Sequence, residues 1–305
     1  MILTVCLNPT LQRTLILESL KISEVNRCSN YRLDASGKGV NVTRVLVQLG
    51  FKAIHLTHGD GVFLPLFKNL LEKDNIEAKI VSSGSEIRFC TTIISLKERT
   101  VTELVEEAKP VLSSTEEYII NQFNELIKST EALVISGTKA PGYSKRLFPF
   151  MVSEAKKRKI LTVLDIRGED LILSLNERPD IIKPNFIEFV HTFFTEEKIS
   201  NNENFKTPEI EDKVKKKMLE IFKRFGTRTV LSSGSDSVLF CENSEIYSIM
   251  PRQVEVINTI GCGDALTAGI TARLLQNKNL SDAVMYGIDC SACNAACIRP
   301  GVIRP

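Results

Sequence analysis

The sequence predicts a three-layer α/β fold, in which a mostly parallel sheet carries helices on both faces and a small β-rich lid is attached. First, apolar runs of strand length alternate with longer helical patterns almost throughout the chain, which is typical of a parallel sheet. Second, the 305 residues are many for one compact domain and few for two, as expected of a large core with an appendage. Third, two stretches, at about residues 12–35 and 87–105, interrupt the alternation.

Short apolar runs spaced along the chain predict the strands of the main sheet. They are Ile2–Leu7, Ala53–Thr57, Leu133–Ser136, Leu161–Ile166, Ile181–Lys183 and Thr229–Ser232. Helical periodicity predicts the helices Val40–Leu49, Leu64–Lys73, Glu116–Lys128, Lys145–Lys159 and Val214–Phe225. Gly50 ends the first helix, and Ser114 stands three residues before Glu117, which is the spacing of a capping box.

The two interrupting stretches predict the lid. In the second stretch, β-rich residues flank the polar Lys97-Glu98-Arg99, which indicates a hairpin. We therefore expect residues 1–305 to form a single domain, with lid segments inserted at about residues 12–35 and 87–105. Because lid strands with exposed edges commonly pair with a second subunit, we expect a homodimer formed through the lid.

Composition excludes several classes of function. Lys+Arg 39 against Asp+Glu 37 leave a net charge of +2, which is too balanced to indicate a nucleic-acid partner or an anionic membrane. The apolar residues 1–7 are too few for a secretion signal, and no run of about 18 apolar residues occurs. The cysteines are scattered rather than arranged as a dense disulfide framework. We expect a cytoplasmic protein with reduced thiols, and no nucleic-acid or membrane partner.

The strongest chemical signal lies near the C-terminus, at Asn258-Thr-Ile-Gly-Cys-Gly-Asp264. This motif follows the strand-like Val254–Ile257 and precedes a helical run. Gly261 and Gly263 leave backbone amides unobstructed at a helix N-terminus, which is a site for an anionic phosphoryl group. A carboxylate beside phosphate is repelled unless it has a task, and Asp264 can accept a hydroxyl proton during phosphoryl transfer. The alternative is that Asp264 only caps the helix.

Two common nucleotide motifs do not occur. The chain has no Gly-x4-Gly-Lys-Ser/Thr loop, and the late glycine motif lacks the third glycine of a dinucleotide fingerprint. A dehydrogenase is therefore the weaker class.

A second glycine-rich segment, Asp34-Ala-Ser-Gly-Lys-Gly-Val-Asn41, runs into a predicted helix. Its glycines permit close approach to a ligand, and Lys38 and Asn41 offer a cation and an amide suited to a hydroxylated ligand, although a purely structural junction is the alternative.

These two glycine-rich elements, one early and one late, give the chain its resemblance to a known family. The sequence resembles the PfkB, or ribokinase-like, carbohydrate kinases, and most closely the branch with 1-phosphofructokinase and tagatose-6-phosphate kinase. The similarity runs end to end: Asn8-Pro9 follows the first strand, Ser136-Gly137 and Pro141-Gly142 match a central motif, and Thr102-Glu103 matches a lid motif. The resemblance implies a ribokinase-like three-layer α/β/α core.

The resemblance also implies which residues form the site. It implies an anion hole of Gly261, Cys262 and Gly263 with Asp264 as the catalytic base, and Glu188 organising magnesium through water. The implied substrate-binding residues are Gln12, Gly37, Lys38, Asn41 and Arg88, with the lid residue Arg88 meeting the substrate phosphate. The implied ATP-binding residues are Lys183, Asn185, Ser232, Gly234 and Asn294. Since Asn185-x-x-Glu188 is also a capping-box pattern, a structural role for this pair stays open.

Most departures from the family pattern fall on the substrate side. Gln12 stands where the branch has an Asp that holds a sugar hydroxyl, so an acceptor has become a mixed donor and acceptor. Ser36 replaces a glycine, and Cys90 and Val105 stand where lid asparagines are usual. On the nucleotide side, Cys262 replaces a small Ala. The phosphoryl donor is thus better supported than the acceptor.

The sequence therefore predicts an ATP-dependent and Mg²⁺-dependent carbohydrate kinase that acts on a sugar phosphate, of the 1-phosphofructokinase or tagatose-6-phosphate kinase type. Arg88 and Lys38 favour a phosphorylated substrate, because both are cations. One alternative is a kinase of an unphosphorylated sugar or a nucleoside. Another is a sugar-phosphate sensor with weak catalysis, to which Gln12 and the altered lid point, and against which the intact Asp264 argues.

Overall fold

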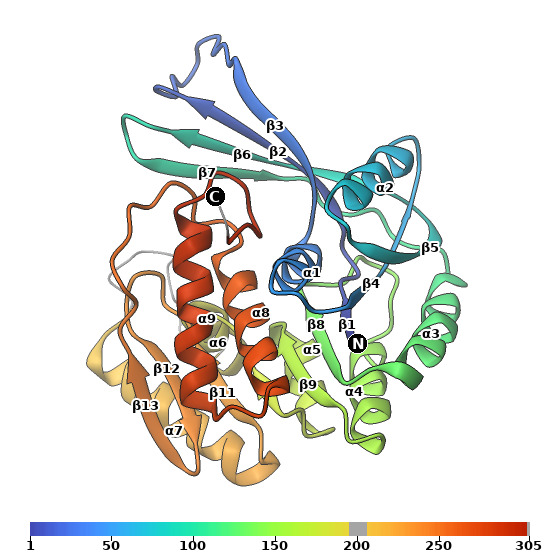
Figure 1. Ribbon diagram of the computed structural model, residues 1–305, viewed down its shortest axis with the longest axis vertical. Coiled ribbons are helices and arrows are strands. Elements are labelled where there is room, and N and C mark those ends of the chain that lie inside the picture. The colour runs from blue at the N-terminus through green and yellow to red at the C-terminus, as the bar shows by residue number, and fades with distance from the viewer. Residues whose placement is uncertain (195–205, 304–305) are drawn as a thin grey trace.

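The computed structural model describes residues 1–194 and 206–303, and in this part of the chain the main element is a nine-stranded sheet (Figure 1). Its strand order is β13-β12-β11-β10-β9-β8-β1-β4-β5. The strands are β1 (Ile2–Val5), β4 (Ala53–Asp60), β5 (Glu77–Glu86), β8 (Ala132–Ser136), β9 (Leu161–Asp165), β10 (Ile181–Ile182), β11 (Arg228–Leu231), β12 (Val238–Glu242) and β13 (Glu245–Ile249). Neighbouring strands are parallel from β5 to β11, and β12 and β13 continue the sheet in antiparallel pairing.

Helices cover both faces of this sheet. On the face towards the viewer in Figure 1 lie α1 (Lys38–Gln48), α8 (Cys262–Leu275) and α9 (Leu280–Ala295). On the other face lie α3 (Thr115–Leu126) with the 3₁₀ turn Ile127–Ser129, α4 (Leu147–Lys157), α5 (Gly168–Leu175), α6 (Phe186–Phe193) and α7 (Pro208–Phe225). The predicted α/β fold class with a mostly parallel sheet is confirmed. No helix in the described part of the chain combines the length and the hydropathy that crossing a membrane requires.

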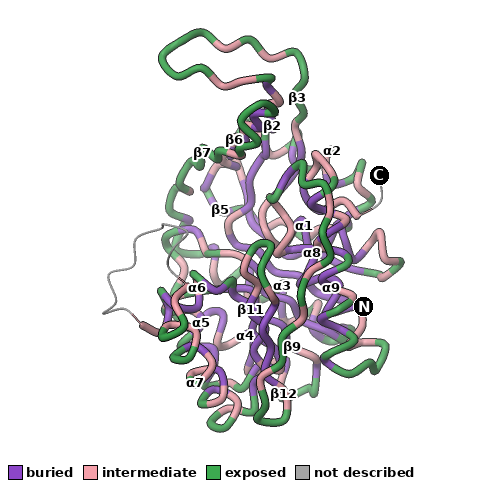
Figure 2. The backbone as a smooth tube through the Cα atoms, turned by 90° about the vertical axis from the view of Figure 1, so that its left-hand side faces the viewer, coloured by how far each residue is buried: buried purple, intermediate pink, exposed green. Residues whose placement is uncertain are grey.

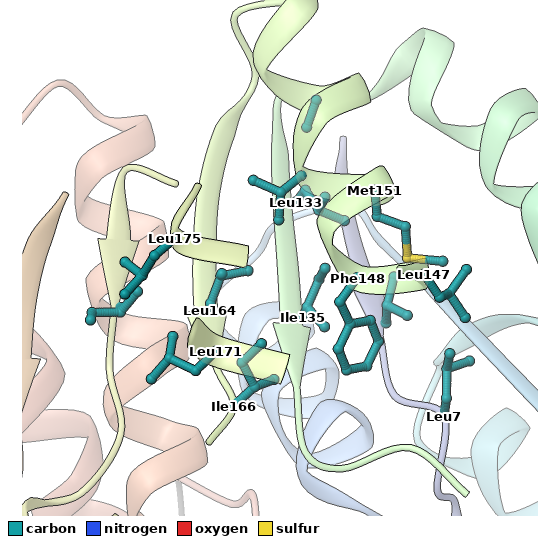
Figure 3. Close-up of a cluster of buried hydrophobic side chains, with 14 of the residues drawn as sticks. Leu7, Leu133, Ile135, Leu147, Phe148, Met151, Leu164, Ile166, Leu171 and Leu175 are labelled. Carbon is teal, nitrogen blue, oxygen red and sulfur yellow. The ribbon is translucent and has the colours of Figure 1, made fainter. Parts of the chain in front are cut away.

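Side chains of β8 show why the sheet is buried on both faces. All five residues of this strand are buried, and alternate residues point to opposite sides. Leu133 and Ile135 pack with Phe148 and Met151 of α4, as Figure 3 shows, whereas Val134 packs in the separate core under α1, α8 and α9. A strand that is apolar at every position is typical of a parallel sheet between two helical layers. Because both faces of these strands are packed against helices, the carboxyl ends of β8 and its neighbours are held in place.

A separate four-stranded sheet has the order β3-β2-β6-β7. Its strands are β2 (Thr10–Leu17), β3 (Asn30–Ser36), β6 (Arg88–Ser95) and β7 (Thr100–Val105), and helix α2 (Leu64–Lys73) packs beside it. The two stretches predicted to leave the main sheet supply all of these strands, and the hairpin around residues 97–99 is confirmed. Figure 2 shows that the connection between β2 and β3 projects from the body and is largely exposed.

Three short junctions connect the small sheet to the core. β1 leads into β2 through residues 6–9, β3 leads into α1 through Gly37, and β5 leads into β6 through Ile87. Gly37 has a φ of 115°, which favours glycine at this turn. Side chains at these junctions therefore lie where the small sheet meets the main sheet.

Two local predictions are wrong. Residues 254–257 form no strand, because the N–H groups of Ile257 and Asn258 donate to the Ala295 carbonyl at the end of α9 instead of joining a ladder. Ser114 makes no side-chain cap at the start of α3, and Glu116 there accepts hydrogen bonds from Ser144 instead. Both segments are fixed by tertiary contacts that a local pattern does not contain.

Candidate active site

A cleft of about 300 Å³ lies between the small sheet and the carboxyl ends of β1, β8 and β9. Crevices at the carboxyl ends of parallel strands are the usual ligand sites of α/β proteins. Residues from the junctions and from these strand ends line it: Cys6, Asn8, Gly37, Lys38, Arg88, Glu103, Val105, Gly137, Thr138, Asp165, Ile166, Arg167 and Glu188. Of the residues predicted from the sequence, Gly37, Lys38, Arg88 and Glu188 thus reach the cleft directly.

The glycine loop before α8 has the geometry of an anion site. Gly261 is the N-cap of α8 with a φ of 82°, and a Cβ there would lie 3.0 Å from the Gly301 nitrogen. The side chain of Asn294 supports the loop from inside, because its Nδ2 donates to the Ile260 carbonyl (2.8 Å) and its Oδ1 accepts from Gly301 N–H (2.6 Å). First-turn N–H groups have no acceptor within the helix, so this end of α8 attracts negative charge.

Lys183 and Gly263 make this end of α8 fit a phosphate group. Lys183 is 2% exposed, and its Nζ would lie 3.5 Å from a Cβ at Gly263. Glycine at this position therefore leaves room between a buried ammonium group and the first helical turn. A phosphoryl oxygen placed there would meet both a positive side chain and free N–H donors.

Asp264 lies in the first turn of α8, and it is 5% exposed. It is not the N-cap, so the alternative interpretation as a helix cap is wrong. Asn41 Nδ2 donates to Asp264 Oδ2 at 2.8 Å. Burial and the nearby charge of Asp165 raise the pKa of Asp264 to about 6, although Lys38, Asn41 and Lys183 act in the opposite direction. A carboxylate with this pKa is ionised at neutral pH and accepts a proton more readily than an ordinary aspartate.

Asp165, at the end of β9, joins the two lysines of the site. Its Oδ1 lies 3.6 Å from Lys38 Nζ, and its Oδ2 lies 3.6 Å from Lys183 Nζ. Burial alone would raise the pKa of Asp165, but Lys183 and Lys38 outweigh it and hold the pKa below the usual range. Burial opposes the charge of Lys38 too, but Asp165 and Glu188 more than compensate and raise the pKa of Lys38. Asp165 thus lies between two lysines, and its charge stabilises the charge of Lys38.

Asn185 and Glu188 form a true capping box at the start of α6. Asn185 Oδ1 accepts from Glu188 N–H at 2.7 Å, and Glu188 Oε2 accepts from Asn185 N–H at 3.1 Å. The other carboxylate oxygen of Glu188 faces the cleft, 3.1 Å from Lys38 Nζ and 4.0 Å from Arg167 Nη1. The structural role left open by the sequence is therefore present, and it still leaves one oxygen for a ligand.

No group of three or more His, Cys, Asp or Glu side chains suited to hold a metal ion occurs within residues 1–194 and 206–303. Magnesium keeps several of its waters in proteins and is usually held by one or two carboxylates together with substrate phosphates. Glu188 lines the cleft, and its capping partner Asn185 is not among the lining residues.

Arg88 lines the cleft, whereas Gln12, Ser232 and Gly234 are not among its lining residues. Arg88 Nη1 donates to the Glu106 carbonyl at 2.5 Å, and its Nε is buried with no hydrogen-bond partner in the described chain. Gln12 is buried in β2 and donates to Thr92 Oγ1 at 2.6 Å. The backbone carbonyl of Ser232 accepts from Phe186 N–H at 2.8 Å, and Gly234 lies in an exposed turn with a φ of 57°.

Several cleft residues were missed by the sequence interpretation. Asp165, Thr138 and Arg167 each stand within two residues of the end of a predicted strand. A polar residue directly after a buried parallel strand is a signal for a ligand site, and this signal was available for Arg167 but not for Asp165, which stands inside the predicted strand. Asn8 and Glu103 were quoted only as parts of family motifs, and both line the cleft.

Comparisons with known proteins give the chain a context. Residues 4–302 match the family described as pfkB family carbohydrate kinase. A tagatose-6-phosphate kinase of Staphylococcus epidermidis is 29% identical over 280 residues, which cover 91% of this chain and 86% of that protein. Phosphofructokinase-2 from Escherichia coli in complex with fructose-6-phosphate superposes with a TM-score of 0.82 at 22% identity, covering 97% and 93% of the two chains. Its tetrameric inhibited form gives a TM-score of 0.82 at 22% identity, covering 97% and 94%.

Proposed function

The chain belongs to the pfkB family of carbohydrate kinases, and from this premise we propose that it transfers a phosphoryl group from ATP to a hydroxyl of a phosphorylated ketohexose. The observation that carries the proposal is the position of Asp264. A buried carboxylate with a raised pKa lies in the first turn of α8, beside an anion-binding loop and a buried lysine. This combination can accept a hydroxyl proton and hold the transferring phosphoryl group at one place.

The residues of the site have separate tasks in this proposal. Asp264 accepts the proton of the acceptor hydroxyl while that oxygen forms its bond to the γ-phosphorus, and the bond from the γ-phosphorus to the bridging oxygen breaks to release ADP. Lys183 and the first-turn N–H groups of α8 stabilise the negative charge on the transferring group. Asp165 holds the two lysines in place.

Magnesium, when bound with ATP, would neutralise charge on the phosphates and orient them for in-line transfer. Glu188 would hold it through water by the carboxylate oxygen that faces the cleft, and Asn185 would complete this contact from the start of α6. A coupled assay for ADP release, run with ATP and a panel of sugar phosphates and repeated in excess chelator, tests the proposal. Turnover that chelator leaves unchanged would contradict the metal dependence.

A phosphorylated acceptor is supported by the charge of the cleft wall. Arg88 belongs to the small sheet and lines the cleft, while Lys38 at the opposite junction is already paired with Asp165 and Glu188. Arg88 is thus a cation of this wall whose Nε is buried with no hydrogen-bond partner among the described residues. The names of the relatives agree, because one is a tagatose-6-phosphate kinase and another was solved with fructose-6-phosphate. We propose tagatose 6-phosphate or a fructose phosphate as the substrate.

We expect Arg88→Ala to remove most of the preference for a sugar phosphate. Hydrogen bonds to a charged group contribute about 1.5–3 kcal/mol each, so the native enzyme should favour the phosphate over the free sugar by at least about tenfold in kcat/KM. The variant should lose this preference and change free-sugar turnover little. A native preference for a free sugar that survives in Arg88→Ala would support a kinase of unphosphorylated sugars or nucleosides instead.

The sensor alternative predicts a different result in the assay for ADP release. A sensor would bind the sugar phosphate and release no ADP beyond background. Its motivation was Gln12 and the altered lid. The Gln12 side chain is engaged by Thr92 within the small sheet and does not line the cleft, whereas Val105 of the lid does. Isothermal titration beside the turnover assay separates the two, because binding without turnover by the native protein would support the sensor.

We also propose that the protein is a homodimer through its small sheet. Large apolar side chains are exposed on strands of this sheet and their connection, namely Ile22, Val25, Tyr31, Leu96, Leu104 and Val105. Strand edges that expose apolar residues favour pairing with a second copy. Light scattering at micromolar concentration should give twice the chain mass, and Tyr31→Glu should lower it. A monomer at that concentration would contradict the proposal.

A further inference from the structure

Arg44 of α1 is a fully enclosed arginine outside the cleft. It is 3% exposed, and its guanidinium group donates to acceptors from separate parts of the fold. Nε donates to Asp74 Oδ2 (2.9 Å) at the end of α2, and Nη1 donates to the Pro300 carbonyl (3.2 Å) near the C-terminus. Nη2 donates to the carbonyl of Ala35 in β3. These contacts fix the position of the guanidinium plane, because a planar fork of donors fits such a set of acceptors in one orientation.

The same guanidinium group controls the side chain of Asn41. Arg44 Nη1 donates to Asn41 Oδ1 at 2.8 Å, and Ser36 Oγ donates to the same oxygen at 3.3 Å. An asparagine amide can turn over and exchange its oxygen and nitrogen, but an arginine has only donors. The amide oxygen must therefore face Arg44, which directs the amide NH₂ group towards Asp264 Oδ2 at 2.8 Å.

We propose that Arg44 is a positioning residue for phosphoryl transfer, because it locks the Asn41 amide in the orientation that donates to the base Asp264. The inference rests on the proposed function for its catalytic meaning. With the amide turned over, its oxygen would face the carboxylate and repel it. With Arg44 in place, Asp264 keeps one oxygen hydrogen-bonded, and its other oxygen is left to accept the hydroxyl proton.

Other groups that face Asp264 have no hydrogen bond to Arg44 in the described structure. They are Asp165 at the end of β9, Lys183 after β10, Lys38 at the start of α1, and the thiols of Cys6 and Cys262. A donor to a carboxylate stabilises its charged form, so removing the Asn41 contact should make Asp264 easier to protonate. Loss of Arg44 should act in that direction alone, since it leaves these other groups in place.

Arg299 offers a matched control for Arg44, because both arginines are paired with Asp74. Its Nη2 donates to Asp74 Oδ1 at 2.6 Å, and its Nε lies 2.8 Å from Asp34 Oδ1. Arg299 thus shares Asp74 with Arg44 but has no hydrogen bond to Asn41 in the described structure. Arg299→Met and Arg44→Met both break contacts to Asp74, and Arg44→Met alone frees the Asn41 amide.

The experiment measures the titration of Asp264 directly and the pH profile of kcat beside it. Carboxyl ¹³C NMR of the native protein, Arg44→Met and Arg299→Met follows Asp264, assigned by its loss in Asp264→Asn. We expect the pKa of Asp264 to rise by about one unit in Arg44→Met and to stay unchanged in Arg299→Met. The acidic limb of kcat should shift equally, which lowers kcat at pH 6 by about fivefold and leaves the KM for ATP unchanged.

Other outcomes are decisive as well. Equal shifts in both variants, or no shift in Arg44→Met, would overturn the inference. If Arg44→Met does not fold by circular dichroism, Arg44→Lys replaces it, because one ammonium group near Asp74 cannot also reproduce the fork towards Asn41. An unshifted titration in that variant would equally overturn the inference. If the NMR shift occurs but the native protein turns over no sugar phosphate, the positioning holds and the proposed function fails.

Discussion

Asp264→Asn should lower kcat by about two to four decades while nucleotide affinity stays within about a few-fold. The amide has the size of the carboxyl group, so the packing of the first turn of α8 is kept. The amide oxygen can still accept the hydrogen bond from Asn41 Nδ2. An amide nitrogen does not accept a proton, and the acceptor hydroxyl then loses its base. The anion loop and Lys183 remain, so ATP should bind as before. Steady-state kinetics and a nucleotide-binding titration measure the two effects separately.

Asp282→Asn is the matched control for this prediction. Asp282 also lies in the first turn of a helix, α9, but it is exposed and distant in sequence from the cleft residues. Both substitutions remove a negative charge from a helix N-terminus, and this charge contributes about 0.3–1 kcal/mol to stability. Asp282→Asn should therefore leave kcat near the native value. Near-normal turnover in Asp264→Asn would mean that another group is the base.

The fold was predictable from the sequence where local pattern and tertiary packing agree. The helix Leu64–Lys73 has the predicted bounds, and strands such as β8 are apolar at every position because both faces are covered. Failures occurred where packing decides. Residues 254–257 have strand-like alternation, but the N–H group of Ile257, like that of Asn258, pairs with the end of α9. Strands β5, β12 and β13 were not predicted. β5 and β13 lie at the two edges of the sheet, and their exposed residues interrupt the apolar runs that indicate buried strands.

The site was predictable to the extent that its residues stand in local motifs. Lys38, Asn41 and Asp264 were identified from glycine-rich junctions, and the structure brings them together although residues 41 and 264 are far apart in the chain. Asp165 and Arg44 were not identified. A single acidic residue at a strand end and an arginine on an apolar helix face have no distinctive local pattern, since their importance comes from partners in other elements.

Asp165→Asn should lower the free energy of unfolding by about 3–5 kcal/mol, because it removes one partner from buried ion pairs. Asp165 is 1% exposed and Lys183 is 2% exposed, so the lysine would be left without this acidic partner in a place that water barely reaches. Lys38 is less affected, since it is more exposed and retains Glu188 at 3.1 Å. Urea denaturation of the native protein and the variant measures the difference.

Asp212→Asn is the control for this stability change. It breaks the pair with Lys216, whose side chains are 61% and 74% exposed, and exposed pairs contribute about 0–1 kcal/mol. A stability loss for Asp165→Asn no larger than that of Asp212→Asn would show that the buried pairs contribute little.

Asp165→Asn should also move the acidic limb of kcat to lower pH. Burial is the main cause of the raised pKa of Asp264, and the charge of Asp165 is the next cause. Removing that charge lowers the pKa of Asp264, so the base stays ionised further into the acidic range. The direction is opposite to the one expected for Arg44→Met, where a donor to the base is lost. We therefore expect the kcat profiles of the two variants between pH 5 and pH 8 to lie on opposite sides of the native profile. They are measured without urea, at a temperature at which both variants are folded. Shifts of the same sign in both variants would contradict Asp264 as the group that the acidic limb reports.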